Sequence, residues 1–147
     1  MIQRIQTVYL IIAGLLAASL LKLRFAEMVI NSNFYTFSAK GIFNNETLLL
    51  QGMPIMVIIG IIVVLHFVII AMYKQRVWQI RLTVFTIVLL VVLFGLFLYF
   101  AYAGINETQV ALKIPSVFPL VAIIFDLLAL RSIRKDEALI RSLNRIR

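Results

Sequence analysis

Long apolar runs separated by short polar stretches dominate this chain. A helix needs about 20 mostly apolar residues to cross the hydrocarbon core of a bilayer. Four stretches have this character, at residues 5–23, 53–73, 82–103 and 115–133. The pattern predicts four transmembrane helices in one membrane domain, residues 1–147, with an outer loop at 24–52 and a tail at 134–147. We expect the first helix to be retained, because Lys22 and Arg24 follow it where a signal peptide would have small residues.

The composition supports a membrane protein over a soluble one. Hydrophobic residues make up 63% of the chain and charged residues 14%, whereas soluble domains are about 45–50% apolar. The formal net charge is +8, which would also suit nucleic-acid binding. The basic residues stand between apolar stretches and do not form the continuous basic patch of a soluble domain. They therefore favour contact with a membrane surface, and we expect no nucleic-acid binding.

The distribution of Lys and Arg predicts the orientation of the helices. Basic residues concentrate in cytoplasmic loops. One side of the predicted membrane holds four, namely Lys22, Arg24, Lys40 and Lys113. The other side holds ten, namely Arg4, Lys74, Arg76, Arg81, Arg131, Arg134, Lys135, Arg141, Arg145 and Arg147. Both termini are therefore expected in the cytoplasm, and the short connections predict an up-down antiparallel arrangement.

The outer loop has the pattern of a small β-hairpin. Residues 33–38 and 42–43 are rich in aromatic and β-favouring side chains, and Gly41 stands between them. The predicted fold class is thus an all-α membrane protein, a four-transmembrane-helix up-down bundle with both ends inside. To this the sequence adds a small β-hairpin in the first outer loop and a basic amphipathic helix at the C-terminus. The apolar residues of the loop could rest on the helices or dock a partner.

Similar short segments recur in the two halves of the chain. Asn45–Glu46–Thr47 precedes Pro54 by the same interval as Asn106–Glu107–Thr108 precedes Pro115. A duplicated two-helix hairpin would explain the match and would give parallel repeats. The alternative is that both triplets start helices, since Asn and Thr often precede an apolar helical run.

Two ionisable residues fall inside the predicted spans, where such groups are functional candidates. His66 lies eight residues before Lys74, and Asp126 lies eight residues before Arg134. At about 1.5 Å per residue, the two side chains are expected at similar depth. A polar layer then includes His66 and Asp126 together with Thr83, Thr86 and Tyr9.

Three interpretations of this layer stay open. His66 and Asp126 could relay a proton or bind a polar ligand. The layer could instead be a structural network that fixes the helices relative to one another. In the third interpretation Asp126 pairs with Arg131 or Arg134 while His66 meets a backbone carbonyl. The chain has one His and no Cys, so we expect no metal site, no cofactor and no catalytic residues.

The tail predicts a basic amphipathic helix that continues the fourth span. Apolar residues recur at helical spacing in Leu139, Ile140, Leu143 and Ile146. The remaining faces carry the candidate lipid- or partner-binding residues Arg134, Lys135, Arg141, Arg145 and Arg147. A helix of this kind binds the anionic inner leaflet or docks on a partner protein.

Both ends of the chain resemble those of a known family. The start, residues 1–10, and the segment 131–137 are similar to an uncharacterised family of small four-span inner-membrane proteins from Bacteroidetes-type bacteria, a domain of unknown function. The resemblance implies the bacterial inner membrane and brings no catalytic residues. We expect a non-enzymatic accessory, scaffolding or assembly subunit of a larger membrane complex, with membrane lipids and a membrane protein as partners. The alternative is a small transporter or ligand-binding membrane protein that uses Asp126 and His66.

Overall fold

The computed structural model describes residues 3–30, 33–44, 47–102 and 109–144. Outside this range lie part of the first Asn–Glu–Thr triplet, all of the second, and the tail residues Arg145 and Arg147. The described helices are α1 (Gln3–Ser19), α2 (Met53–Ala71), α3 (Arg76–Tyr102) and α4 (Phe118–Asn144), with a short 3-10 helix η1 (Ile114–Val117) before α4. The strands are β1 (Arg24–Ile30), β2 (Asn33–Ser38), β3 (Gly41–Asn44), β4 (Thr47–Gln51) and β5 (Gln109–Leu112).

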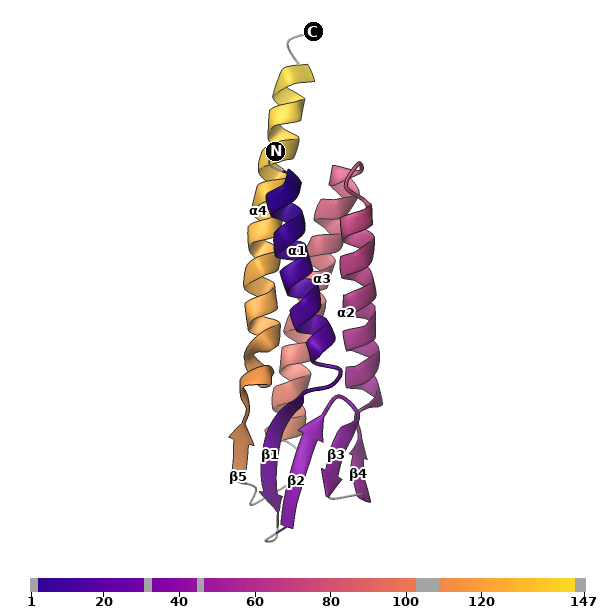
Figure 1. Ribbon diagram of the computed structural model, residues 1–147, viewed down its shortest axis with the longest axis vertical. Helices are drawn as coiled ribbons and strands as arrows, with labels where there is room; N and C mark the ends of the chain where they lie inside the picture. The colour runs from indigo at the N-terminus through magenta and orange to yellow at the C-terminus, as the bar shows by residue number, and fades with distance from the viewer. Residues whose placement is uncertain (1–2, 31–32, 45–46, 103–108, 145–147) are drawn as a thin grey trace.

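The four described helices lie side by side, and the strands extend from one end of them (Figure 1). We call this the sheet end, and the opposite end, where both termini lie, the tail end. Helices α1 and α3 each pack extensively against both α2 and α4, so α2 and α4 lie on one diagonal. Each helix buries one stripe of residues spaced three or four apart, as helical periodicity requires. The stripe of α3 is Gln79, Thr83, Thr86, Leu90, Leu93, Phe97 and Ala101.

The described strands form one five-stranded antiparallel sheet in the order β4-β3-β2-β1-β5. The prediction of an all-α four-helix bundle with a small hairpin is therefore wrong. The first connection alone contributes four strands, and β5 from the second connection pairs with β1. A pairing between segments about eighty residues apart depends on how the helices bring the two connections together, which no local sequence pattern shows.

An aromatic cluster attaches the sheet to the helices. The Phe25 ring of β1 stacks on the Phe97 ring of α3, with 4.2 Å between centroids. Phe37 of β2 meets both rings edge-on. Phe25 and Phe37 are fully buried, as is Ile42 of β3. Burial of this inward face explains why the sheet forms on the end of α3, since a sheet needs one covered apolar face to be stable.

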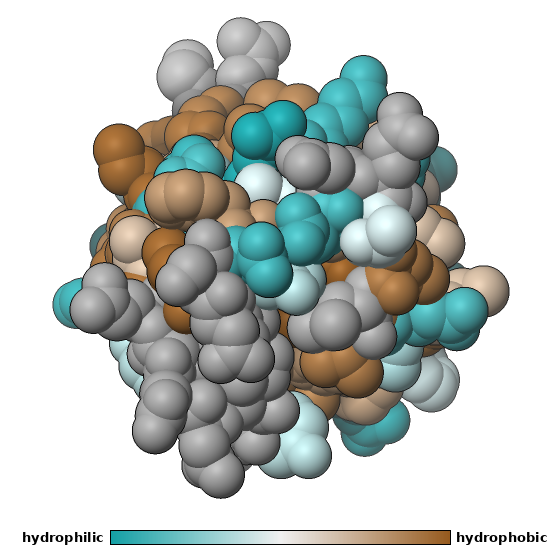
Figure 2. Space-filling view, turned by 90° about the horizontal axis from the view of Figure 1, so that it is seen from below, coloured by the Kyte–Doolittle hydropathy of each residue, from teal (hydrophilic) through white to brown (hydrophobic). Residues whose placement is uncertain are grey.

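The outward face of the sheet carries apolar residues as well. Because side chains alternate along a strand, the register places Val29 opposite Phe34 and Phe43 opposite Leu48 on this face. Phe34 is 75% exposed, and Leu48 is also exposed. Viewed from the sheet end, hydrophobic side chains lie on the surface among hydrophilic ones (Figure 2). We call Val29, Phe34, Phe43 and Leu48 the outward apolar face.

The helix ends differ from those that apolarity alone predicted. Helix α3 begins at Arg76 and not near residue 82, because the backbone N–H of Gln79 already donates to the Gln75 carbonyl. Helix α4 runs through the expected tail to Asn144 and keeps its direction (Figure 1). The described part of the tail thus projects along the axis of α4 and does not turn to lie across the helix ends.

Candidate functional site

A buried His–Asp pair crosses the interior of the helical part. His66 of α2 is 2% exposed and Asp126 of α4 is 0% exposed. His66 Nε2 lies 3.2 Å from Asp126 Oδ1. The two residues come from the helices on the diagonal, so the contact spans the centre of the helical part. The sequence predicted that His66 and Asp126 lie at similar depth, and in the structure the two side chains are in contact.

The second ring nitrogen determines where the protons lie. His66 Nδ1 is 2.8 Å from the Ile62 carbonyl oxygen, and a carbonyl only accepts, so Nδ1 carries a proton. One further proton then lies between Nε2 and Asp126 Oδ1. Either an imidazolium N–H donates to a carboxylate, or a carboxylic acid O–H donates to a neutral imidazole. In both forms the pair as a whole is neutral, which suits an apolar interior.

Asp126 has hydrogen-bonding capacity left over. Its Oδ2 is buried and has no hydrogen-bond partner within the described part of the chain. A buried polar oxygen without a donor is costly, by roughly 1–3 kcal/mol. Such atoms are uncommon in folded proteins and call for an explanation, which can be a bound water, an ion or a catalytic or binding role.

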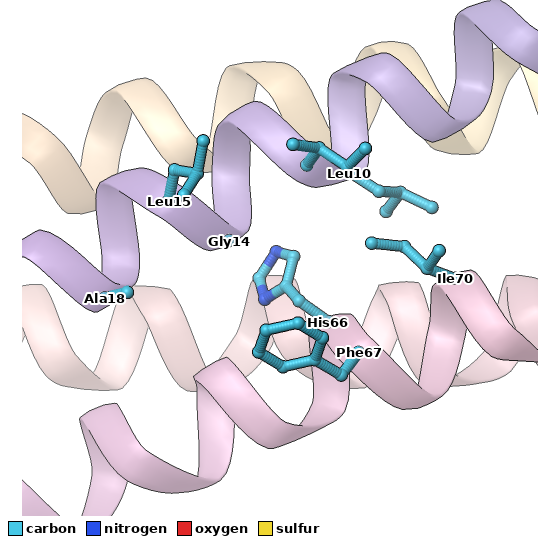
Figure 3. Close-up of a pocket in the computed structure, with 8 residues that line it drawn as sticks. Leu10, Gly14, Leu15, Ala18, His66, Phe67 and Ile70 are labelled. Carbon is cyan, nitrogen blue, oxygen red and sulfur yellow. The ribbon is translucent and has the colours of Figure 1, made fainter.

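A small cavity of about 90 Å³ lies beside His66, between α1 and α2. Figure 3 shows the imidazole extending from α2 toward Gly14 of α1. Leu10 and Ile70 lie on one side of the ring, and Ala18 lies on the other. A Cβ at position 14 would stand 3.2 Å from His66 Cβ, so glycine leaves the room that the ring occupies. The cavity walls are otherwise apolar, and Leu15 and Phe67 at its mouth are exposed.

The other three residues of the expected layer have partners other than His66 and Asp126. Thr83 and Thr86 are fully buried, and each hydroxyl donates to a carbonyl of its own helix, those of Gln79 and Leu82. Tyr9 is half-buried and its ring packs against Phe125, with 6.3 Å between centroids. The structure thus joins His66 and Asp126 directly. The hydroxyls of Thr83 and Thr86 instead donate within α3, as Ser and Thr in helices often do to a carbonyl of the preceding turn.

The structure has a second polar layer at the tail end, which was not predicted from the sequence. The buried Gln6 side chain of α1 donates through Nε2 to Asp136 of α4. Buried Gln79 of α3 donates to the Ile69 carbonyl in the last turn of α2, at 3.2 Å. Helical periodicity could have predicted the burial of Asp136, because this residue continues the buried stripe of α4 that runs through Asp126, Ala129 and Ile133.

The basic residues of the tail stay at the surface where they are described. Arg134 and Lys135 are exposed on α4, whereas the side chain of Arg141 lies outside the described part of the structure, as do Arg145 and Arg147. Within the described residues, no group of three or more His, Cys, Asp or Glu side chains could hold a metal ion.

Three described helical segments are long and apolar enough to cross a membrane, at Met53–Ala71, Arg76–Tyr102 and Ile114–Ile140, and Ile5–Ser19 is a shorter apolar helix. The chain thus has the features of a membrane protein. It belongs to the family described as domain of unknown function (DUF4293), whose model matches residues 2–146. The expected resemblance to an uncharacterised family is thereby confirmed. No curated protein and no solved structure matches the chain.

Proposed function

We propose that this chain is a non-enzymatic protein of the inner membrane of Bacteroidetes-type bacteria, and an accessory, scaffolding or assembly subunit of a larger membrane complex. All four helices cross the membrane in this proposal. Helix α1 has 17 residues, or about 26 Å at 1.5 Å per residue, which is close to the roughly 30 Å of a bilayer core. The ten basic residues of the tail end favour the cytoplasm for both termini, and the sheet then lies in the periplasm.

Single-cysteine labelling tests this orientation, because the chain has no native cysteine. Lys40 in the β2–β3 turn and Lys74 after α2 are both exposed, at opposite ends of the molecule. We expect a membrane-impermeant maleimide to label Lys40→Cys in cells with a permeabilised outer membrane and to label Lys74→Cys only after lysis. The reverse pattern would overturn the orientation.

The outward apolar face is the observation that carries the accessory role. A folded sheet fixed to membrane helices places Phe34 and Leu48 outside the bilayer, where water would otherwise cover them. Exposed apolar residues grouped on one face mark protein–protein contacts, and aromatic residues dominate the binding energy of such contacts. A membrane partner with a periplasmic segment fits this face.

Native purification in mild detergent, followed by mass spectrometry, tests the accessory role. We expect stoichiometric membrane proteins to accompany the chain. Phe34→Ser with Leu48→Ser should lower their yield about tenfold or more, as loss of roughly 1.4 kcal/mol or more predicts. Ile114→Ser is the matched control, because Ile114 is 79% exposed but lies outside the sheet. A chain that purifies alone, or equal losses in both variants, would contradict the proposal.

A second candidate function is transport or binding of a small polar ligand or proton at His66 and Asp126. The unpartnered Oδ2 of Asp126 favours it, since this oxygen can accept a hydrogen bond that the protein does not supply. The small number of polar residues in the layer argues against transport, because a transport path requires polar groups along several spans. If a strain that carries Asp126→Asn at normal abundance grows normally, this second function is excluded.

A further inference from the structure

A groove lies at the tail end between the α2–α3 turn and helix α4. Residues 74–78 line one wall, and Glu137 and Ile140 of α4 line the other. Its volume is about 320 Å³, at the lower end of the roughly 300–1,000 Å³ typical of small-molecule sites. The groove is separate from the His66–Asp126 pair along the helix axes, since Glu137 follows Asp126 by eleven residues in α4, or about 16 Å at 1.5 Å per residue.

Two cationic side chains and an aromatic ring line this groove, and Tyr73 and Arg81 lie next to them. Lys74 and Arg76 contribute positive charge to its wall, and Trp78 contributes an indole that is 53% exposed. The Lys74 ammonium lies 5.8 Å from the centre of the Tyr73 ring, and the Arg81 guanidinium lies 5.4 Å from that of Trp78. Tryptophan and tyrosine beside Lys and Arg are typical of the level of lipid headgroups.

The acidic residue in the groove has its own partner. Glu137 lines the wall opposite Lys74 and Arg76, and it already makes an interaction within the protein. The apolar residues Val77 and Ile140 also line the groove. The lining therefore holds two cationic side chains, one carboxylate and apolar surface. Its formal charge is positive, which suits a ligand that has an anionic head and an apolar body.

We propose that this groove binds the phosphate headgroup of an anionic phospholipid. The proposal rests on the membrane location argued above and not on the accessory role. Lys74 and Arg76 would contact the phosphate, and Trp78 would lie against the glycerol region. A lipid fits better than a soluble phosphate compound, because the groove opens where the apolar surfaces of α3 and α4 end and its lining is partly apolar.

Fluorescence quenching by brominated lipids tests the site directly. Trp78 is the one tryptophan of the sequence and lines the groove, so its emission reports on the lipids next to this residue. The full chain is reconstituted in phosphatidylcholine vesicles with a minor fraction of phosphatidylglycerol. Bromine is placed either on the phosphatidylglycerol or on an equal fraction of the phosphatidylcholine. Both leaflets carry the quencher, so the result depends on neither protein orientation nor a protein partner.

We expect brominated phosphatidylglycerol to occupy the neighbourhood of Trp78 several-fold more than its share of the lipid, since each basic side chain at the surface enriches anionic lipid about fivefold. Lys74→Gln with Arg76→Gln should abolish most of this preference, and Lys74→Gln alone should reduce it. Arg131→Gln with Lys135→Gln removes the same charge from exposed positions of α4 outside the groove and should leave the preference intact.

Three results would overturn the proposal. Equal quenching by the two brominated lipids would show that the groove does not select anionic lipid. Equal losses in the two double variants would show diffuse attraction to the surface without a site. Displacement by inorganic phosphate would indicate a soluble phosphate ligand. Single-cysteine labelling could give the reverse pattern while brominated phosphatidylglycerol is still enriched near Trp78. The proposed orientation would then be wrong, and the lipid site would still be supported.

Discussion

Asp126→Leu should destabilise the protein strongly, whereas His66→Leu with Asp126→Leu should restore most of the lost stability. The single variant leaves His66 Nε2 without a partner in a fully buried position. Removing one member of a buried pair costs about 3–5 kcal/mol, while replacing both by apolar residues of similar size is often neutral or stabilising. Thermal unfolding in detergent, monitored by the monodisperse fraction in size-exclusion chromatography, measures both effects.

Asp126→Asn is the informative control for this cycle. An amide N–H can donate to Nε2 of a neutral imidazole whose Nδ1 still donates to Ile62, so the contact survives. We expect only a small loss of stability, although the variant can no longer exchange a proton. If Asp126→Asn is as unstable as Asp126→Leu, the pair stabilises the fold in its imidazolium–carboxylate form, which an amide cannot replace.

Gly41→Ala should disrupt the sheet while the helices remain intact. Gly41 has φ of 134°, a backbone conformation that residues with a side chain rarely adopt. An added Cβ would also collide with the carbonyl oxygen of Leu50 in β4. Backbone strain of about 1–3 kcal/mol adds to this collision, which the rigid backbone cannot relieve. Faster proteolysis of the sheet, with normal helical circular dichroism, is the expected result.

Gly60→Ala and Gly95→Ala are matched controls within the helices. An added Cβ at either position would meet nothing within 4 Å. In a helix, alanine is favoured over glycine by roughly 0.5–1 kcal/mol, so both variants should be as resistant to protease as the native chain. If Gly41→Ala is as resistant as these controls, β3 and β4 do not pair as described. If the sheet is lost, co-purified partners should be lost with it, because the outward apolar face would no longer exist.

The sequence predicted the helices well where long apolar runs define them and less well at their ends. Residues 53–73 contain α2, yet α3 extends beyond its apolar run at the tail end to Arg76. Helix ends are set by backbone hydrogen bonds such as that from Gln79 to Gln75, which hydropathy does not report. The similar depth of His66 and Asp126 was predicted by counting residues along the helices, because the rise per residue of a helix is constant. Their direct contact was one of three interpretations that the sequence left open.

The sheet and the tail-end layer show what such reasoning misses. The β-favouring residues 33–38 indicated strand, but the extent of the sheet depends on β5, whose four residues lie in the second connection. Gln6 and Gln79 stand near helix ends, where polar residues are common. Their burial depends on which face each helix turns inward, and only the full stripe of each helix reveals that face.

The pairing of β1 with β5 has a consequence for how the chain is made. Synthesis produces α1, the strands β1–β4 and α2 before any of the second half exists. Until β5 emerges, the β1 side of the sheet is an open edge, and open edges invite aggregation. His66 and Gln6 lack their partners Asp126 and Asp136 for longer still, because both partners lie in α4, which follows β5. The first half therefore lacks the contacts that complete its sheet and its buried polar pairs, and the newly made chain can form all of them only after α4 has been translated.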